Sequence, residues 1–330
     1  MNIQFEIPIL LLIFKREDST LKVLDEIRKQ KPKYLFVAAD GPRENNEDDI
    51  ENCEKTRQAV LENIDWDCEV KTLFRDHNRG CGYGPAEAIT WFFEQVEHGI
   101  ILEDDIIPSQ TFFSFCEELL IKYKDDEKVM SIAGTNFVSQ TYTSSESYNF
   151  TNYAGGWGWA SWRRAWKYYD YNISAWENPK VKKIIRNKFS LAGYHFWKEA
   201  FDMVCNKNIN HIWDYQWAFC KMANDGIGII PSKNLTTNIG FGEDATHTFD
   251  ASQDILIANV NEEIHFPLIH PSEIKINNDF DKFISERFFS KTPEKKLNSN
   301  SLRKILQKKS LLKNLLKKIY WKLLSVIRKE

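Results

Sequence analysis

The 330-residue chain lacks several features that would place it across a membrane or in an oxidising compartment. No segment stays apolar for the roughly 20 residues that a membrane-spanning helix needs. The apolar stretch at residues 7–14 contains Pro8 and has no basic segment before it, so we interpret it as a buried strand rather than a signal peptide. The six cysteines form no CxxC pair, which is typical of reduced, partly buried thiols and argues against a disulfide framework.

Charge is nearly balanced overall but unevenly distributed. The net charge is −3 at pH 7, whereas residues 291–330 hold 13 Lys and Arg against 2 Asp and Glu and carry +11. The first 290 residues therefore carry −14. Because this larger part is acidic, we expect no nucleic acid as a partner.

The first 135 residues alternate strand-like and helix-like patterns. The predicted strands are residues 7–14, 34–39, 69–74, 99–103 and 129–133. The predicted helices are residues 19–29, 48–63, 85–98 and 112–124. This alternation predicts the α/β class, with a Rossmann-like, mostly parallel sheet flanked by helices.

The pattern becomes less regular after residue 135. A helix is expected from Asp214 to about residue 224, followed by a short strand at residues 226–231. We divide the chain into residues 1–135, 136–290 and 291–330.

The most informative motif is an apolar run, residues 100–102, that ends in Glu103, Asp104 and Asp105. The run fits a strand buried on both faces, and in parallel sheets ligands bind at the carboxyl ends of the strands. Three adjacent carboxylates repel one another unless a positive group lies among them, and a divalent cation with a phosphate behind it is the usual one. Along an extended strand Asp104 faces away from the other two, so a single cation need not bind all three acids directly. We assign Asp105 to the metal.

Other charged residues follow neighbouring strands. Arg16 and Asp40 come directly after the first and second strands, where we expect Arg16 to pair with a phosphate and Asp40 to accept hydrogen bonds from a base or ribose. Arg79 lies in a glycine-rich segment, residues 77–82, whose backbone can approach a ligand closely. For Arg16 and Asp40 the alternative is a solvated loop charge.

Together these residues resemble a GT-A-fold glycosyltransferase, and within that class the N-acetylglucosaminyltransferase I type. The acid triplet and the residues after it, 106–113, are similar to that family's EDD motif with its hydrophobic turn and aromatic helix start. Arg16 and Asp40 stand where the family has a nucleotide-contacting Arg and Asp. The similarity covers residues 5–250 as a succession of motifs, of which only the EDD stretch is individually specific.

The resemblance implies transfer of a sugar from a nucleotide-diphosphate donor, most simply a UDP-sugar, with Mn²⁺ or Mg²⁺ and with inversion. Residues 1–135 would then bind the nucleotide sugar and residues 136–290 the acceptor. Arg16, Asp40, Arg79, Glu103 and Asp104 are the expected donor-binding residues. His247 falls near a Ser-His pair of the family, and it is either a further metal ligand or a structural loop residue.

The catalytic base is where this chain departs from the family. Residues 213–217 resemble the family's Trp-Asp-Asp-Trp segment, but Tyr215 replaces the second acid. Either Asp214 deprotonates the acceptor hydroxyl or it only caps its helix, in which case Glu243 and Asp244 are the next candidates.

A glycine–aromatic segment, residues 156–159, also resembles a loop beside the family's active site. We expect Trp157 and Trp159 to stack on the acceptor sugar, and Trp162 and Trp166 to pack in the core.

The residue pattern of the C-terminal segment predicts a basic amphipathic helix. Leu, Ile and aromatic residues recur every three or four positions over residues 302–327, with Lys between them. Such a helix binds an anionic membrane surface or packs on protein, and we favour the membrane. The predicted protein is a cytoplasmic glycosyltransferase, peripheral on the inner face of the membrane, with a glycan or lipid-linked acceptor.

Two other functions remain. A sugar-nucleotide nucleotidyltransferase shares the fold but needs a glycine-rich signature at the first strand, which residues 10–16 lack. A non-catalytic carbohydrate-binding protein on the same fold is the third hypothesis.

Overall fold

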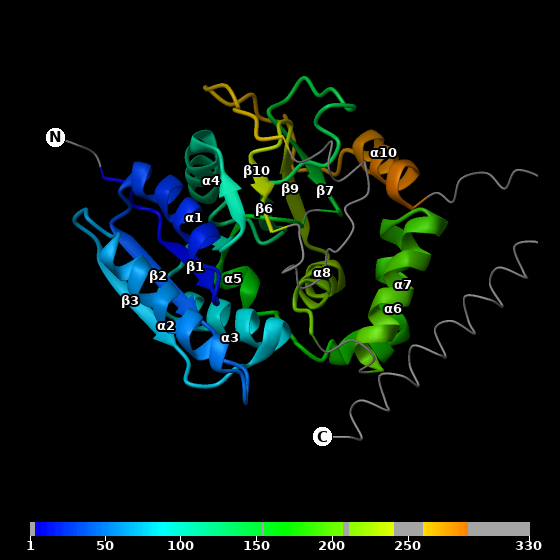
Figure 1. The fold of residues 1–330 in the computed structure, drawn as a ribbon. Coiled ribbons are helices and arrows are strands. Elements are labelled where there is room, and N and C mark those ends of the chain that lie inside the picture. The colour runs from blue at the N-terminus through cyan, green and yellow to red at the C-terminus, as the bar shows by residue number, and fades with distance from the viewer. Residues whose placement is uncertain (1–3, 154, 207–210, 241–259, 290–330) are drawn as a thin grey trace, which may run out of the picture. The chain divides into compact units, whose positions relative to one another are not determined.

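A computed structural model describes residues 4–153, 155–206, 211–240 and 260–289. They show a mixed α/β architecture with a large, mostly parallel sheet flanked by helices, which confirms the predicted fold class (Figure 1). Glu243, Asp244, His247 and the predicted tail helix at residues 302–327 lie outside the described residues.

The central sheet has eight strands in the order β3-β2-β1-β4-β8-β6-β9-β7. Their bounds are β1 Ile9–Ile13, β2 Tyr34–Ala39, β3 Glu69–Phe74, β4 His98–Glu103, β6 Val129–Ala133, β7 Tyr148–Thr151, β8 Trp159–Trp162 and β9 Ile227–Pro231. Strands β1 to β4 are mutually parallel, β8 runs antiparallel to both β4 and β6, and β7 runs antiparallel to β9. The carboxyl ends of β1 to β4 therefore share one edge of the sheet.

Helices cover both faces of this sheet. Their bounds are α1 Glu17–Gln30, α2 Glu47–Glu62, α3 Gly80–Gln95, α4 Gln110–Lys122, α5 Arg163–Trp166, α6 Pro179–Lys188, α7 Leu191–Cys205, α8 Asp214–Ala223 and α10 Asn278–Phe288, with a 3₁₀ turn at Ser174–Glu177. Alternate residues of β1 contribute to two different cores. Ile9 and Leu11 belong to the core that includes buried residues of α1 and α4, whereas Leu10 belongs to the core that includes buried residues of α3 and α8. Burial on both faces explains why the strand is apolar throughout.

A second, two-stranded sheet lies beside the acid triplet. It pairs β5, Ile106–Pro108, antiparallel with β10, Thr236–Asn238. The amide of Ile239 donates to the carbonyl of Asp105 at 2.8 Å, so the chain just after β10 is fixed against the triplet. A segment more than a hundred residues downstream is thereby attached to the end of β4.

Several predicted elements have the expected bounds, and two need correction. Helix α3 begins at Gly80, and Pro85 lies inside it rather than in a first turn. Trp159, expected at the end of a loop, instead begins strand β8 in the middle of the sheet. The predicted packing of Trp162 and Trp166 in the core is confirmed, since they are 2% and 4% exposed.

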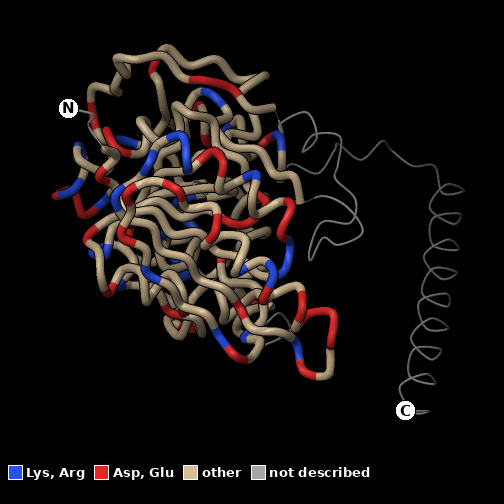
Figure 2. Tube along the Cα trace, turned by 60° about the vertical axis from the view of Figure 1, so that its left-hand side comes forward, with Lys and Arg blue, Asp and Glu red and all other residues tan. Residues whose placement is uncertain are grey.

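Charged residues are interspersed over the described part of the chain. In the view of Figure 2, Lys and Arg positions alternate with Asp and Glu positions along the trace. Charge alone therefore does not single out a binding face in this view. Among the described residues, no helix has the length and apolar character to cross a membrane.

Candidate functional site

The acid triplet lies at the carboxyl edge of the parallel strands. Glu103 is the last residue of β4 and pairs in register with Leu12 of β1, and Asp104 and Asp105 form the turn into β5. The side chains of Asp104 and Asp105 are 6% and 15% exposed. The sequence thus places three carboxylates where a parallel sheet presents ligands.

Arg16 supplies the positive group that the acids require. It is the N-cap residue of α1 and follows β1. Its guanidinium donates to both carboxylate oxygens of Asp104, and its Nη2 donates to Oδ2 of Asp105 at 2.9 Å. Burial opposes the charge of Arg16, but the carboxylates of Asp104 and Asp105 outweigh that effect and raise its pKa. Arg16 is therefore charged and oriented at the triplet.

The carboxylates themselves have a raised affinity for protons. Burial, followed by the negative charges of Asp105, Asp104 and Asp214, raises the pKa of Glu103. Burial also raises the pKa of Asp104, against the opposing effect of Arg16. Carboxylates that repel one another in this way would be stabilised by an added cation.

Asp214 is brought to this cluster from far along the chain. It is the first residue of α8, whose N-cap is Trp213, and not the cap that the sequence predicted. Its charge acts on Glu103, and Trp213 stacks on Trp159 with ring centroids 5.7 Å apart. Because Trp159 pairs in register with Ile101 of β4, the start of α8 lies beside the end of that strand.

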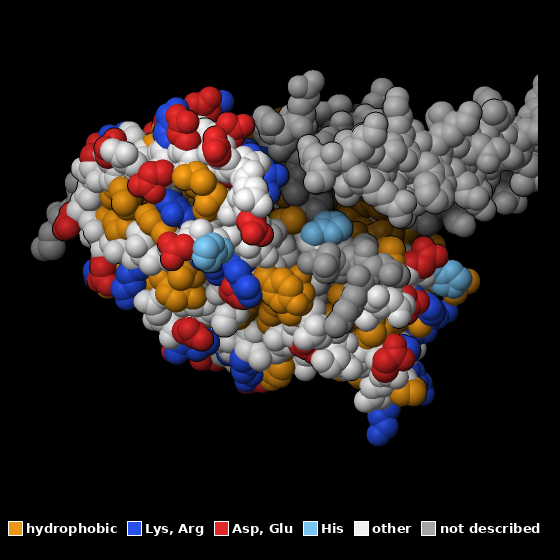
Figure 3. All heavy atoms as spheres, turned by 60° about the horizontal axis from the view of Figure 1, so that its bottom comes forward, with side chains coloured by type: hydrophobic (Ala, Val, Ile, Leu, Met, Phe, Trp, Pro, Cys, Tyr) orange, Lys and Arg blue, Asp and Glu red, His pale blue; other side chains and the backbone are white. Residues whose placement is uncertain are grey.

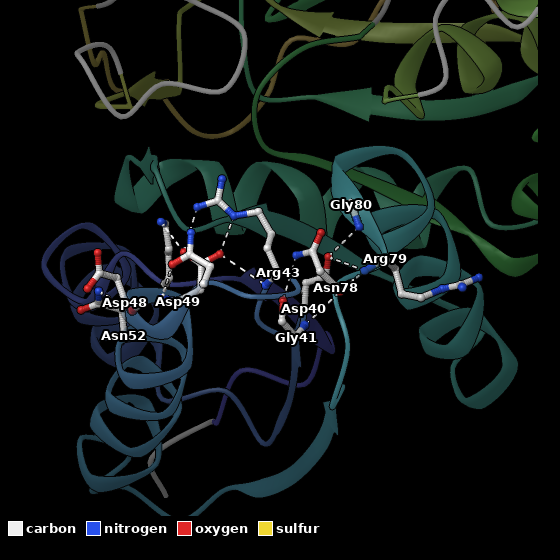
Figure 4. Close-up of polar contacts among 11 residues, drawn as sticks. Asp40, Gly41, Arg43, Asp48, Asp49, Asn52, Asn78, Arg79 and Gly80 are labelled. Carbon is white, nitrogen blue, oxygen red and sulfur yellow. Dashed lines mark hydrogen bonds and ion pairs between the residues drawn. The ribbon is translucent and has the colours of Figure 1, made fainter. Parts of the chain in front are cut away.

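Asp40 lies at the carboxyl end of β2 and caps α3. Its carboxylate accepts hydrogen bonds from the amides of Arg79 at 2.8 Å, Gly80 at 2.9 Å and Gly41 at 3.0 Å (Figure 4). Burial raises its pKa, and these amides partly offset the effect. The cap explains why α3 starts at Gly80, because a carboxylate from another strand satisfies the first amides of the helix.

Arg79 contributes its backbone to this cap, while its side chain turns to the surface. The guanidinium pairs with Glu87 at 2.6 Å and lies 5.7 Å from the ring centroid of Tyr83. Half of the Arg79 side chain is exposed.

A second ion-pair network, which the sequence did not predict, flanks the same edge. Asp49 in the first turn of α2 is fully buried, and it pairs with Lys15 at 2.6 Å and with the guanidinium of Arg43 (Figure 4). The hydrogen bonds from Arg43, followed by Lys15, hold the pKa of Asp49 well below its usual range, against the effect of burial. In the sequence, Asp49 is one of three acids that open a helix, and nothing local distinguishes it from its neighbours.

The two tryptophans predicted to stack on sugar have different environments. Trp159 is 5% exposed and packs among Trp166, Trp213 and Trp217, so it does not present an open face, and its role as a stacking platform is corrected. The reason is its place in β8, where the side chain points into the core. Trp157 is partly exposed and packs edge-to-face on Phe137.

Gly240 is a further site residue that sequence reasoning missed. A Cβ atom at this position would lie 2.8 Å from Cγ of Asp105 and 3.0 Å from Nη1 of Arg16, and closer still to the Asp105 carboxylate. The backbone of Gly240 therefore packs directly against the ion pair.

The donor set fits a hard divalent ion only with help from a substrate. Within the described residues, no three His, Cys, Asp or Glu side chains are grouped to hold a metal by themselves. Asp105 is partly exposed and offers carboxylate oxygen, and Mg²⁺ is commonly bound by one or two carboxylates with water and substrate phosphates completing its shell. The arrangement fits a metal that is held jointly with a phosphate ligand.

Comparison with known proteins identifies no family. No family model matches the chain, and no curated protein sequence matches it. A solved mannosyltransferase, PcManGT from Pyrobaculum calidifontis in complex with GDP-Man and Mn²⁺, is 12% identical over 67% of this chain and 70% of its own, with a TM-score of 0.37.

Two further structures are similar at the same low level. The inositol-1-phosphate CTP transferase from T. maritima is 8% identical over 78% of this chain and 97% of its own, with a TM-score of 0.34. Mouse xyloside xylosyltransferase 1 is 9% identical over 66% and 82%, with a TM-score of 0.28. At these scores the structural similarities carry no argument about function.

Proposed function

We propose that the protein is a metal-dependent glycosyltransferase of the GT-A type that uses a nucleotide-diphosphate sugar. The observation that carries the proposal is the acid triplet at the end of β4, with Arg16 inserted between Asp104 and Asp105. Carboxylates for a metal and a fixed guanidinium for phosphate, at the carboxyl edge of a parallel sheet, suit a diphosphate.

The donor would lie across the ends of β1, β2 and β4. Arg16 binds a phosphate oxygen, Asp105 holds Mn²⁺ or Mg²⁺, and Glu103 and Asp104 accept hydrogen bonds from sugar or ribose hydroxyls. Asp40 and Arg79 border the nucleotide end, where the capped start of α3 fixes the loop. The metal, when bound, neutralises the charge that develops on the departing diphosphate.

Asp214 is the proposed base. It would take the proton from the acceptor hydroxyl as that oxygen attacks the anomeric carbon, so that the sugar is transferred with inversion. Its position beside Glu103 supports this role. The acceptor hydroxyl attacks the anomeric carbon from the face opposite the departing diphosphate, so the base must lie close to the donor sugar. Glu243 and Asp244 remain the next candidates.

The other parts of the chain have proposed roles as well. Residues 1–135 bind the donor, residues 136–290 bind a glycan or lipid-linked acceptor, and residues 291–330 bind an anionic membrane surface. Trp157 remains a candidate acceptor contact, and His247 a candidate metal ligand.

Calorimetric titration with UDP-sugars and GDP-sugars, with and without Mn²⁺, tests the proposal. We expect donor binding that depends on the metal and is lost in Asp105→Asn. Asp76→Asn is the matched control, because Asp76 is an exposed acid in the loop after β3 at the same edge. Donor binding that is equally tight without the metal and in Asp105→Asn would refute the proposal.

A product assay separates the alternatives. A transferase releases a nucleoside diphosphate, whereas a nucleotidyltransferase interconverts a nucleoside triphosphate plus a sugar phosphate with a nucleotide sugar plus pyrophosphate. Pyrophosphate exchange without sugar transfer would favour the nucleotidyltransferase, and binding without turnover would favour a carbohydrate-binding protein.

A further inference from the structure

Two tyrosines from distant segments stack on each other at the surface. Tyr83 lies in the first turn of α3, and Tyr171 follows α5. Their ring centroids are 3.9 Å apart and the ring planes are inclined by 20°. Tyr83 is 43% exposed and Tyr171 is half-buried. Because the pair stays this exposed, it adds little to the hydrophobic core and instead presents an aromatic surface to solvent.

Tyr83 lies close in sequence to residues at the carboxyl edge of the sheet, where the donor is proposed to bind. Cys81, two residues before Tyr83, lies near both Asp40 and Glu103. Burial, with smaller contributions from the charges of Asp40 and Glu103, raises the pKa of its thiol. The helix turn that carries Tyr83 is also the turn that Asp40 caps.

Tyr171 lies close in sequence to a residue that contacts the segment of the proposed base. The hydroxyl of Tyr169 donates to the carbonyl of Trp213 at 3.1 Å, directly before Asp214. Tyr171 is two residues further along the same loop, a span of at most about 7 Å. Tyr83 is therefore two residues from Cys81, on which Glu103 acts, and Tyr171 is two residues from the tyrosine that contacts Trp213.

We propose that Tyr83 and Tyr171 form an aromatic shelf that binds a pyranose ring of the acceptor glycan. This inference rests on the proposed function and names the acceptor subsite that the buried Trp159 does not provide. Flat aromatic rings pack against the apolar face of a sugar, while neighbouring polar groups bind its hydroxyls. Glu87, one helical turn after Tyr83 in α3 and partly exposed, supplies a carboxylate that can accept from such hydroxyls.

The position of the shelf favours the acceptor over the donor. The donor's diphosphate belongs at Arg16 and Asp105. Tyr171, by contrast, lies two residues after Tyr169, whose hydroxyl donates to the carbonyl of Trp213, the residue before the proposed base. Figure 3 turns forward the underside of Figure 1, where α3 lies, and apolar side chains alternate there with charged ones. Such a mixed surface suits an oligosaccharide, which has both apolar faces and hydroxyls.

Binding of the full-length chain to an array of immobilised oligosaccharides, without nucleotide, tests the shelf. We expect the wild type to bind at least one saccharide, and Tyr83→Leu and Tyr171→Leu to bind it about tenfold more weakly. Leucine keeps apolar volume but removes the flat ring, and Tyr83→Phe, which keeps the ring, should retain binding.

Tyr168→Ala is the matched control. This tyrosine is 38% exposed and its ring is contacted by Lys167, so we expect unchanged saccharide binding. Wild-type affinity in both leucine variants, or a wild type that binds no saccharide, would overturn the inference. Saccharide binding that depends on the shelf, in a protein that binds no nucleotide sugar, would keep the shelf and refute the glycosyltransferase.

Discussion

Replacing Gly240 with alanine should disable the site while leaving the fold intact. The new Cβ atom would lie 2.8 Å from Cγ of Asp105 and 3.0 Å from Nη1 of Arg16, where ordinary contacts begin at 3.4 Å. The carboxylate of Asp105 must therefore move by the order of 1 Å, which breaks its 2.9 Å hydrogen bond from Arg16.

The expected effect of Gly240→Ala is large on the rate of sugar transfer and small on the folding free energy. A reacting group misplaced by about 1 Å can cost about a hundredfold in rate, and we expect sugar transfer to fall by that factor. The overlap is with the flexible end of a side chain, so the cost in folding free energy should be about 1 kcal/mol. That corresponds to a melting temperature lower by about 3 °C or less in a domain of this size.

The assay compares Mn²⁺-dependent nucleotide binding, transfer rate and thermal unfolding in Gly240→Ala and wild type. Gly155→Ala is the control, because a Cβ atom at Gly155 would meet no atom within 4 Å. If Gly240→Ala bound metal and nucleotide as tightly as the wild type and turned over normally, the placement of Asp105 at the reacting phosphate would be wrong.

Three further predictions follow from other residues. Asp214→Asn should lower transfer by about 10²- to 10⁴-fold and leave donor binding unchanged in calorimetry, and unchanged turnover would move the base to another acid. Asp49→Asn should destabilise the fold by about 1–3 kcal/mol at pH 7, with Asp48→Asn near neutral. The pKa of Asp49 is depressed in the folded state, so the extra stability of the wild type is present above the unfolded pKa of about 4 and shrinks as the pH falls below it. Urea unfolding at several pH values would detect this change. A chain truncated at Lys291 should no longer float with anionic vesicles, and continued flotation would disprove membrane binding by the tail.

Prediction from the sequence succeeded where a strand is buried on both faces. The bounds of β2 and β6 match the predicted ranges, because a continuous apolar run between polar turns allows few alternatives. The same logic placed Glu103, Asp104 and Asp105 at a strand end. It failed for β8, because the glycines directly before this strand indicate a loop. The strands that β8 pairs with, β4 and β6, are distant in the chain.

The start of α3 shows why some boundaries escape local reasoning. Pro85 indicates a first helical turn when only neighbours in the chain are considered. The helix instead starts at Gly80, because the carboxylate of Asp40, forty residues upstream, accepts from the amides of Arg79 and Gly80.

The sequence by itself determined the fold class and the location of the acid triplet, since hydrophobic periodicity and residue type are local properties. Only the tertiary structure decided which groups meet the triplet: Arg16 between Asp104 and Asp105, Asp214 beside Glu103, and the backbone of Gly240 against the ion pair. It also showed Trp159 to be buried and placed Tyr83 on Tyr171. Such contacts join residues far apart in the chain, and no local pattern encodes them because their energy arises only after the sheet has brought the strand ends together.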